Sequence, residues 1–153
     1  MMFKITSPAF EHQKEIPSQY TCEGTSDNVS PALHWSGAPQ KTKTFALIVD
    51  DPDAPNQKHM FVHWVLANIP ATVHELSENA DIEPFVAGIN DYGTTHYAGP
   101  CPPSGTHRYY FKLYALDTTL DVTQGITKEQ LLNAMQGHIL GQAELMGTYT
   151  KKK

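Results

Sequence analysis

Short runs of β-branched and aromatic residues recur along most of the chain, separated by residues that favour turns. The three longest runs lie at residues 43–50, 61–68 and 109–116, and we expect each to form a strand. Residues 16–22 and 32–35 have the pattern of shorter strands. Because turn signals, and not regular helices, stand between these runs, the sequence predicts antiparallel sheets, most simply a β-sandwich.

Side chains alternate between the two faces of a strand, which sorts the residues of the predicted strands. In the second strand one face would hold Phe61, His63, Val65 and Ala67, and the other Val62, Trp64 and Leu66. In the third strand the face that begins with His107 continues through Tyr109, Phe111 and Leu113. Both histidines therefore stand at the start of a strand. If the loops before them meet, a pocket forms from Asp51, Asp53, His63 and His107.

The pattern becomes helical at residue 126. Thr127 can cap a helix, and Gln130, three residues later, completes a capping box. The apolar stripe that follows consists of Leu131, Leu132 and Met135. Residues 138–149 are compatible with a second helix or with a closing strand. The sequence therefore predicts one or two C-terminal helices beside the sheets.

Length and charge narrow the class of protein. A chain of 153 residues with 40% hydrophobic residues fits a single domain, 1–153, with residues 150–153 as a frayed tail. The net charge of -5 argues against a nucleic-acid-binding surface. We find no apolar run of about 18 residues and therefore expect no membrane insertion. The start, MMFKITSPAFEH, lacks the apolar segment of a signal peptide, so we expect a cytoplasmic protein.

Cys22 and Cys101 are the two cysteines of the chain. In a cytoplasmic protein we expect two reduced thiols. A disulfide between Cys22 and Cys101 is the alternative if the two loops meet. Two cysteines make no zinc site by themselves, and their spacing is not that of a redox Cys-x-x-Cys motif. Two histidines and one carboxylate could hold a metal, but a second carboxylate at ligand spacing is missing. We therefore expect no metal and no cofactor.

An Asp and a His are also the orienting half of a hydrolytic triad. Ser104, Thr106 or Cys101 could supply the nucleophile of such an enzyme. The chain contains neither a Gly-x-Ser-x-Gly elbow nor a His-Glu-x-x-His motif. A small hydrolase is thus the alternative to a non-catalytic binding protein. A protein that regulates a partner is a third class, which the residues do not separate from a ligand carrier.

Four sequence blocks occur in an order that resembles the phosphatidylethanolamine-binding protein family. They are DDPDAP, the HW pair, NDYG and GPCPPSGTHRYYF. SPAFEHQKEIPSQYTCEG and SPALHWSGAP extend the resemblance, which is greatest for the bacterial Raf-kinase-inhibitor-like branch and covers residues 3–149. The resemblance implies a sandwich of antiparallel sheets with peripheral helices. It also implies a small pocket for phosphate-like head groups.

The resemblance assigns residues to this pocket. It implies ligand-binding roles for Asp51, His63, Gly99, Pro100, His107 and Tyr109, and supporting roles for Asp53, Pro55 and Phe61. Asp53 would brace its loop, and Phe61 stands where the family often has a larger aromatic residue. The implied partner is a small anionic or phosphorylated ligand. A protein partner, such as a kinase or a protease, and a homodimer stay open.

An aspartate beside an anion requires an explanation, because like charges repel. We expect Asp51 to contact a histidine and to favour its imidazolium form, so that two histidines offer N–H donors to the anion. Backbone N–H groups near Gly99 and Gly105 could add donors. Arg108 should point to the opposite face of its strand and pair with a carboxylate there.

Overall fold

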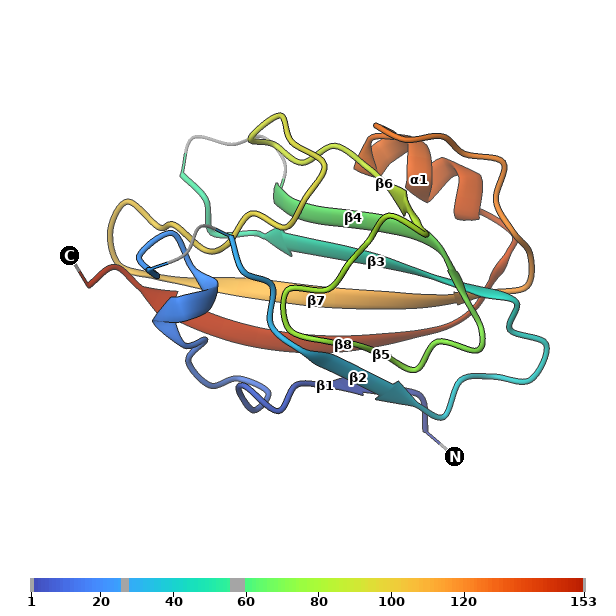
Figure 1. The fold of residues 1–153 in the computed structure, drawn as a ribbon, viewed down its shortest axis with the longest axis horizontal. Coiled ribbons are helices and arrows are strands. Elements are labelled where there is room, and N and C mark those ends of the chain that lie inside the picture. The colour runs from blue at the N-terminus through green and yellow to red at the C-terminus, as the bar shows by residue number, and fades with distance from the viewer. Residues whose placement is uncertain (1, 26–27, 56–59, 153) are drawn as a thin grey trace.

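The protein consists of two antiparallel sheets packed face to face (Figure 1). The structure is a computed structural model, and it describes residues 2–25, 28–55 and 60–152. The larger sheet has the strand order β6-β4-β3-β7-β8. Its strands are β3 (Thr44–Asp51), β4 (Phe61–Pro70), β6 (Val86–Ala87), β7 (Thr106–Leu116) and β8 (Ile139–Thr150). The smaller sheet, in the order β1-β2-β5, consists of β1 (Lys4–Thr6), β2 (Leu33–Ser36) and β5 (Glu75–Leu76). The predicted sandwich is confirmed.

The main core lies between the two sheets. From the central strand β3 it receives Phe45, Leu47 and Val49. These side chains meet Leu33 and Trp35 of β2, and the Trp35 and Phe45 ring centroids are 5.7 Å apart. The alternation along β3 therefore places every second residue in the core between the sheets.

A single described α-helix, α1 (Lys128–Met135), covers the other face of the large sheet. Leu131 and Met135 are fully buried there. The predicted capping box is present: the Gln130 N–H donates to Thr127 Oγ1 (3.1 Å), and the Thr127 N–H donates to Gln130 Oε1 (3.0 Å). Residues 139–150 form a strand, which settles the ambiguity for this segment. In the described part of the chain, no helix has the length and apolar character of a membrane span.

Residues 16–22 do not form the predicted strand. They contain a short 3₁₀ helix, η1 (Ser18–Tyr20), preceded by Pro17 with φ -58°. The Tyr20 N–H donates to the carbonyl oxygen of Pro17 (3.0 Å). Proline fixes φ and cannot donate to a sheet, so the chain turns here despite its β-like composition.

The C-terminal segment is attached to the fold. Thr150 is the last residue of β8, and the backbone N–H of Lys152 donates to Glu23 Oε1 (3.0 Å). We expected residues 150–153 to fray. Thr150 and Lys152 instead have the contacts given above. Lys153 lies outside the described residues.

A β-bulge interrupts the pairing of β3 with β4. Val49 pairs with Trp64, but the next residue, Asp50, pairs with Val62. His63 is thus one extra residue on β4, and it has no partner across the ladder. Bulges of this kind redirect side chains and often occur beside functional sites.

The bulge changes which residues of β4 share a face. His63 and Trp64, although consecutive, both lie on the side of the small sheet: Trp64 is in the main core, and the His63 ring is 5.3 Å from that of Tyr109. Val62 lies on the α1 side together with Val65. The predicted faces, one with Phe61, His63, Val65 and Ala67 and one with Val62, Trp64 and Leu66, are therefore wrong.

The capping box allows a stability test. Replacing Thr127 by Ala removes the acceptor for the Gln130 N–H, so the free energy of unfolding should fall by about 1 kcal/mol. Urea denaturation followed by circular dichroism measures this change. Thr127→Ser keeps the hydroxyl and should retain most of the stability. Equal losses in both variants would contradict the capping role.

Candidate functional site

A cavity of about 190 Å³ opens where β3 ends and where β4 and β7 begin. Its aspartate and its two histidines come from these three strands, and the rest of its lining comes from the same strands and the loops around them. We call it the Asp51 cavity. It is lined by Asp51, Ala54, Pro55, Phe61, His63, Tyr92, Cys101, Pro102, Pro103, His107 and Tyr109.

Asp51 and His107 form a buried pair in this cavity. The His107 Nδ1–H donates to Asp51 Oδ2 (2.7 Å), and only 7% of His107 and 2% of Asp51 are exposed. The other carboxylate oxygen, Oδ1, accepts the backbone N–H of Asp53 (2.7 Å). Asp51 thus contacts a histidine, as expected, and both its oxygens have protein donors. The Nε2 atom of His107 has no hydrogen bond within the described residues and is left for a ligand.

His63 is held in a parallel way by the backbone. Its Nδ1–H donates to the carbonyl oxygen of Ala98 (2.7 Å), which fixes the tautomer and leaves Nε2 as an acceptor. Burial lowers the pKa of His63, and the Ala98 hydrogen bond and the nearby Asp51 charge raise it by less. His63 is therefore neutral at neutral pH. We expected both histidines to donate to the anion as imidazolium groups. His63 takes this form only in acid, so at neutral pH the expectation is wrong for His63.

Aromatic rings surround the two histidines. Phe61 lies 5.2 Å from the His63 ring, and Tyr92 lies 4.9 Å from Phe61 and 5.9 Å from His63. Tyr109 is almost completely buried, and burial raises its pKa, so its phenol stays protonated. The Tyr109 hydroxyl is thus a donor at physiological pH.

The loop that carries Tyr92 is organised by Asn90, a buried side chain that the sequence analysis did not single out. Asn90 Oδ1 accepts the backbone N–H groups of Tyr92 and Thr94, each at 3.0 Å. Its Nδ2 donates to the carbonyl oxygen of His63 at the bulge (3.3 Å). The NDYG block was the available signal for both Asn90 and Tyr92.

Gly99 and Pro100 do not line the Asp51 cavity. The Gly99 N–H donates to Asn28 Oδ1 (3.1 Å), and a Cβ at Gly99 would lie 2.4 Å from the carbonyl oxygen of Tyr20. The carbonyl oxygen of Pro100 accepts the N–H of Cys22 (3.1 Å). These two residues hold their loop against the segment around η1. The cavity wall is instead made by the next residues, Cys101, Pro102 and Pro103.

Asp53 and Arg108 form an ion pair outside the cavity. Arg108 Nη2 lies 2.8 Å from Asp53 Oδ1, and Arg108 Nε and the Arg108 backbone N–H both donate to Oδ2 at 2.9 Å. These hydrogen bonds lower the pKa of Asp53. Asp53 thereby ties its loop to β7, and Arg108 points to a carboxylate as expected. Of the other supporting residues, Pro55 and Phe61 line the cavity.

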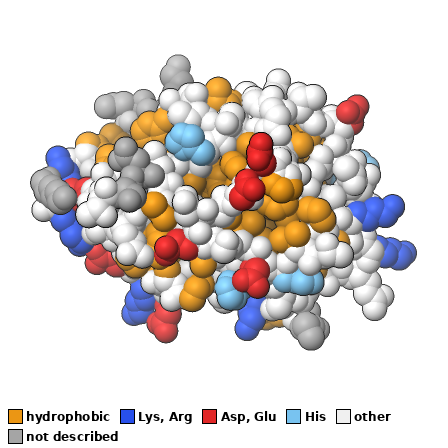
Figure 2. All heavy atoms as spheres, viewed as in Figure 1, with side chains coloured by type: hydrophobic (Ala, Val, Ile, Leu, Met, Phe, Trp, Pro, Cys, Tyr) orange, Lys and Arg blue, Asp and Glu red, His pale blue; other side chains and the backbone are white. Residues whose placement is uncertain are grey.

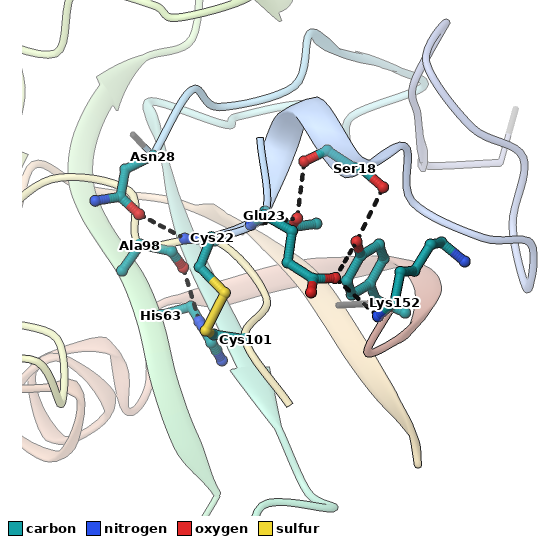
Figure 3. Close-up of a disulfide and its surroundings, with 11 residues drawn as sticks. Ser18, Cys22, Glu23, Asn28, His63, Ala98, Cys101 and Lys152 are labelled. Carbon is teal, nitrogen blue, oxygen red and sulfur yellow. Dashed lines mark hydrogen bonds between the residues drawn. A yellow bond between two sulfur atoms is a disulfide. The ribbon is translucent and has the colours of Figure 1, made fainter. Parts of the chain in front are cut away.

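Cys22 and Cys101 form a disulfide, with their Cα atoms 5.4 Å apart (Figure 3). The expectation of two reduced thiols is wrong for this structure, because the two loops meet beside the Asp51 cavity. Ser104 is exposed and does not line the cavity, and Thr106 Oγ1 lies 2.6 Å from Thr150 Oγ1. Of the three candidate nucleophiles, the Cys101 sulfur is therefore bound in the disulfide. The hydroxyl groups of Ser104 and Thr106 are not part of the cavity lining.

A metal site needs several ligand side chains close together. Across residues 2–25, 28–55 and 60–152, no three His, Cys, Asp or Glu side chains gather closely enough to hold a metal ion. The Asp51–His107 pair and His63 do not form such a group, and both Asp51 oxygens accept hydrogen bonds from the protein.

Comparisons with known proteins agree with this fold. The family model for phosphatidylethanolamine-binding protein matches residues 6–150. A UPF0098 protein of Methanothermobacter thermautotrophicus is 51% identical over 152 residues, which cover 96% of this chain and 98% of that protein.

Two solved structures are also similar. A phosphatidylethanolamine-binding protein homologue from Chlamydia trachomatis has a TM-score of 0.93 and 45% identity, with 98% of each chain covered. YbcL of E. coli, described as a new member of the mammalian family, has a TM-score of 0.90 and 33% identity, with 99% of this chain and 100% of that chain covered. Together with the match over residues 6–150, these similarities show that the chain belongs to the phosphatidylethanolamine-binding protein family.

Proposed function

We propose that this protein binds small anionic, phosphate-bearing ligands in the Asp51 cavity and catalyses no reaction of its own. One observation carries the proposal. The imidazoles of His63 and His107 line the same cavity, and each has its Nδ1 atom held by a protein acceptor. Each Nε2 atom is therefore left for a ligand, in an orientation that the protein has fixed in advance.

The two histidines offer complementary hydrogen-bonding groups. Neutral His63 presents an Nε2 acceptor, which suits a P–OH group. When His107 carries both protons, it donates through Nδ1 to Asp51 and through Nε2 to a phosphate oxygen. The Tyr109 hydroxyl can donate to a second oxygen. Asp51 accepts the Nδ1–H of His107, so a doubly protonated His107 is a charge-assisted donor to the anion that Asp51 holds in place.

The size of the cavity supports a small ligand or a head group. Pockets for drug-sized molecules usually measure about 300–1,000 Å³, whereas the Asp51 cavity has about 190 Å³. The names of the relatives refer to phosphatidylethanolamine, whose head group contains a phosphate. The apolar rim of prolines and aromatic rings would contact the part of a ligand next to its phosphate.

Other features of the structure bear on the alternatives. A hydrolase would need a nucleophile in the cavity, but Cys101 is bound in the disulfide and Ser104 is not part of the cavity lining.

The net charge of -5 and the scattered lysine and arginine side chains on the face in Figure 2 favour a small ligand over a nucleic acid. A protein partner, such as a kinase or a protease, would have to contact the cavity rim. A cytoplasmic location remains a prediction, and the oligomeric state stays open.

Removing one imidazole should weaken anion binding. His107→Ala deletes the group that pairs with Asp51 and donates to the ligand, so the affinity should fall by about 1.5–3 kcal/mol, or roughly 10- to 150-fold. Calorimetric titration with inorganic phosphate and with glycerophosphoethanolamine measures the loss.

His138→Ala is the matched control for this experiment. His138 forms a similar pair with Asp117 (2.8 Å) but does not line the Asp51 cavity. Its replacement should leave both affinities unchanged. If His107→Ala binds as tightly as the unmodified protein, the anion does not bind at this pair.

The lowered pKa of His63 predicts a pH dependence. The phosphodiester of glycerophosphoethanolamine has no P–OH group, so it needs a donor from His63, which exists only in the imidazolium form. Its affinity should therefore rise as the pH falls below about 6.5, the ordinary histidine value, and continue to rise through the lowered pKa of His63.

Calorimetry from pH 8 to pH 5 tests this dependence. A gain of about tenfold corresponds to one hydrogen bond to a charged group. His63→Gln should lose the part of the rise below pH 6.5 that comes from His63, so its affinity should increase less on acidification than that of the unmodified protein. Affinity that stays constant or falls on acidification would rule out His63 as the group responsible.

The absence of catalysis is tested directly. Purified protein should hydrolyse generic phosphatase, esterase and peptidase substrates no faster than the His107→Ala variant does. The expectation follows from the placement of Ser104 and Cys101. Turnover that disappears in Ser104→Ala would instead support the hydrolase alternative.

A further inference from the structure

We propose that the Cys22–Cys101 disulfide is a redox-controlled clamp on the Asp51 cavity. With the bridge closed, the segment 101–105 is held in place, and its first three residues form a wall of the cavity. Reduction of the bridge releases this segment and weakens ligand binding. The inference rests on the proposed function in one respect only, namely that the cavity binds an anion.

The bridge stands at the rim of the cavity. Cys101 lines it together with the next two residues, Pro102 and Pro103. On its other side, Cys101 and Cys22 both line a neighbouring cavity of about 250 Å³. The disulfide is therefore part of the partition between two hollows. Figure 3 shows it next to the hydrogen bond that orients His63.

One end of the clamp is firmly fixed. Thr21 Oγ1 donates to the carbonyl oxygen of Ser18 (2.7 Å) within the turn that carries Cys22. Glu23 Oε1 accepts the Tyr149 hydroxyl (2.7 Å) and the Lys152 N–H (3.0 Å), which ties this turn to the end of β8 (Figure 3). Cys22 thus belongs to a segment anchored independently of the disulfide.

The other end depends on the bridge. Upstream of Cys101, the loop is anchored without it, because the Tyr97 hydroxyl donates to the Tyr20 carbonyl (2.8 Å) and the Gly99 N–H donates to Asn28. Downstream, β7 begins at residue 106. Between these anchors, no backbone hydrogen bond to another described residue holds residues 101–105. The disulfide is the covalent restraint on this part of the wall.

The bridge is accessible to reductants, since both cysteines are exposed. Exposed disulfides are more easily reduced than buried ones and are often regulatory. A dithiol can reduce it in two steps: a thiolate attacks one sulfur and breaks the S–S bond, and its second thiol then resolves the mixed disulfide. The dithiol loses two electrons and two protons and becomes a disulfide. Cys22 and Cys101 become thiols.

Release of the wall affects binding by an entropic route. In the closed form the wall is ordered before the ligand arrives, whereas in the reduced form the ligand must order it, which costs affinity. The polar base of the cavity should survive, because Asp51 and His107 are held by other contacts. The effect of reduction is therefore partial, about three- to tenfold in affinity.

The test compares the oxidised protein with the same protein reduced by dithiothreitol. Affinity for inorganic phosphate and for glycerophosphoethanolamine is measured by NMR titration. We expect about three- to tenfold weaker binding after reduction. The double variant Cys22→Ser/Cys101→Ser should bind like the reduced protein and should not respond to dithiothreitol. Equal affinities of the oxidised and reduced forms, or a response of the double variant, would overturn the proposal.

A measurement without ligand separates this inference from the proposed function. Amide ¹⁵N relaxation should show greater mobility of Cys101, Ser104 and Gly105 after reduction, with Ala98 and Gly99 unchanged. Unchanged mobility of the 101–105 segment refutes the clamp, whether or not anions bind. If the mobility changes as expected but neither form binds phosphate or glycerophosphoethanolamine, the anion-binding function fails and control of ligand affinity fails with it, leaving a redox-sensitive loop.

Discussion

β3 and β4 pair in one register from Leu47 and Leu66 to Val49 and Trp64, and one extra residue on β4 then resets the pairing to Asp50 and Val62. Without this step His63 would stand opposite Asp50 and face α1. With it, the imidazole turns to the side of Asp51, where Ala98 orients it and a ligand can reach it. The candidate site, with two histidines in one cavity, therefore depends on a single bulge in the ladder.

The two adjacent aspartates at the end of β3 serve opposite faces of the sheet. Asp51 binds His107 on the cavity side. Asp50 is fully buried on the α1 side, where the ammonium groups of Lys112 and Lys128 lie 3.0 and 2.7 Å from its oxygens. Buried carboxylates need such partners. The two neighbouring carboxylates thus have separate roles: Asp51 orients His107 in the candidate site, and Asp50 fixes the helix to the sheet.

Features with a local chemical cause could be predicted from the sequence, such as the three long strands and the Thr127 cap. The strand pattern suggested that Asp51 and the two histidines meet if their loops do, and the family resemblance assigned them to one pocket. What could not be predicted depends on contacts between distant segments. The bulge at His63 is set by the register with β3, and the disulfide requires two loops that are 79 residues apart in sequence to meet. The resemblance assigned Gly99 to the cavity wall, whereas the structure packs it against the Tyr20 carbonyl, a contact that the sequence alone does not reveal.

The strand order also bears on how the chain reaches its native state. The central strand β3 pairs with β4, which follows it closely, and with β7, which comes much later in the chain. Long-range pairing of this kind forms slowly, because a large loop must close first. The Asp51 cavity takes residues from both sides of β3, so it is absent until the later pairing is complete. A ligand of this cavity would therefore bind only the native state. Such a ligand would stabilise the protein against unfolding.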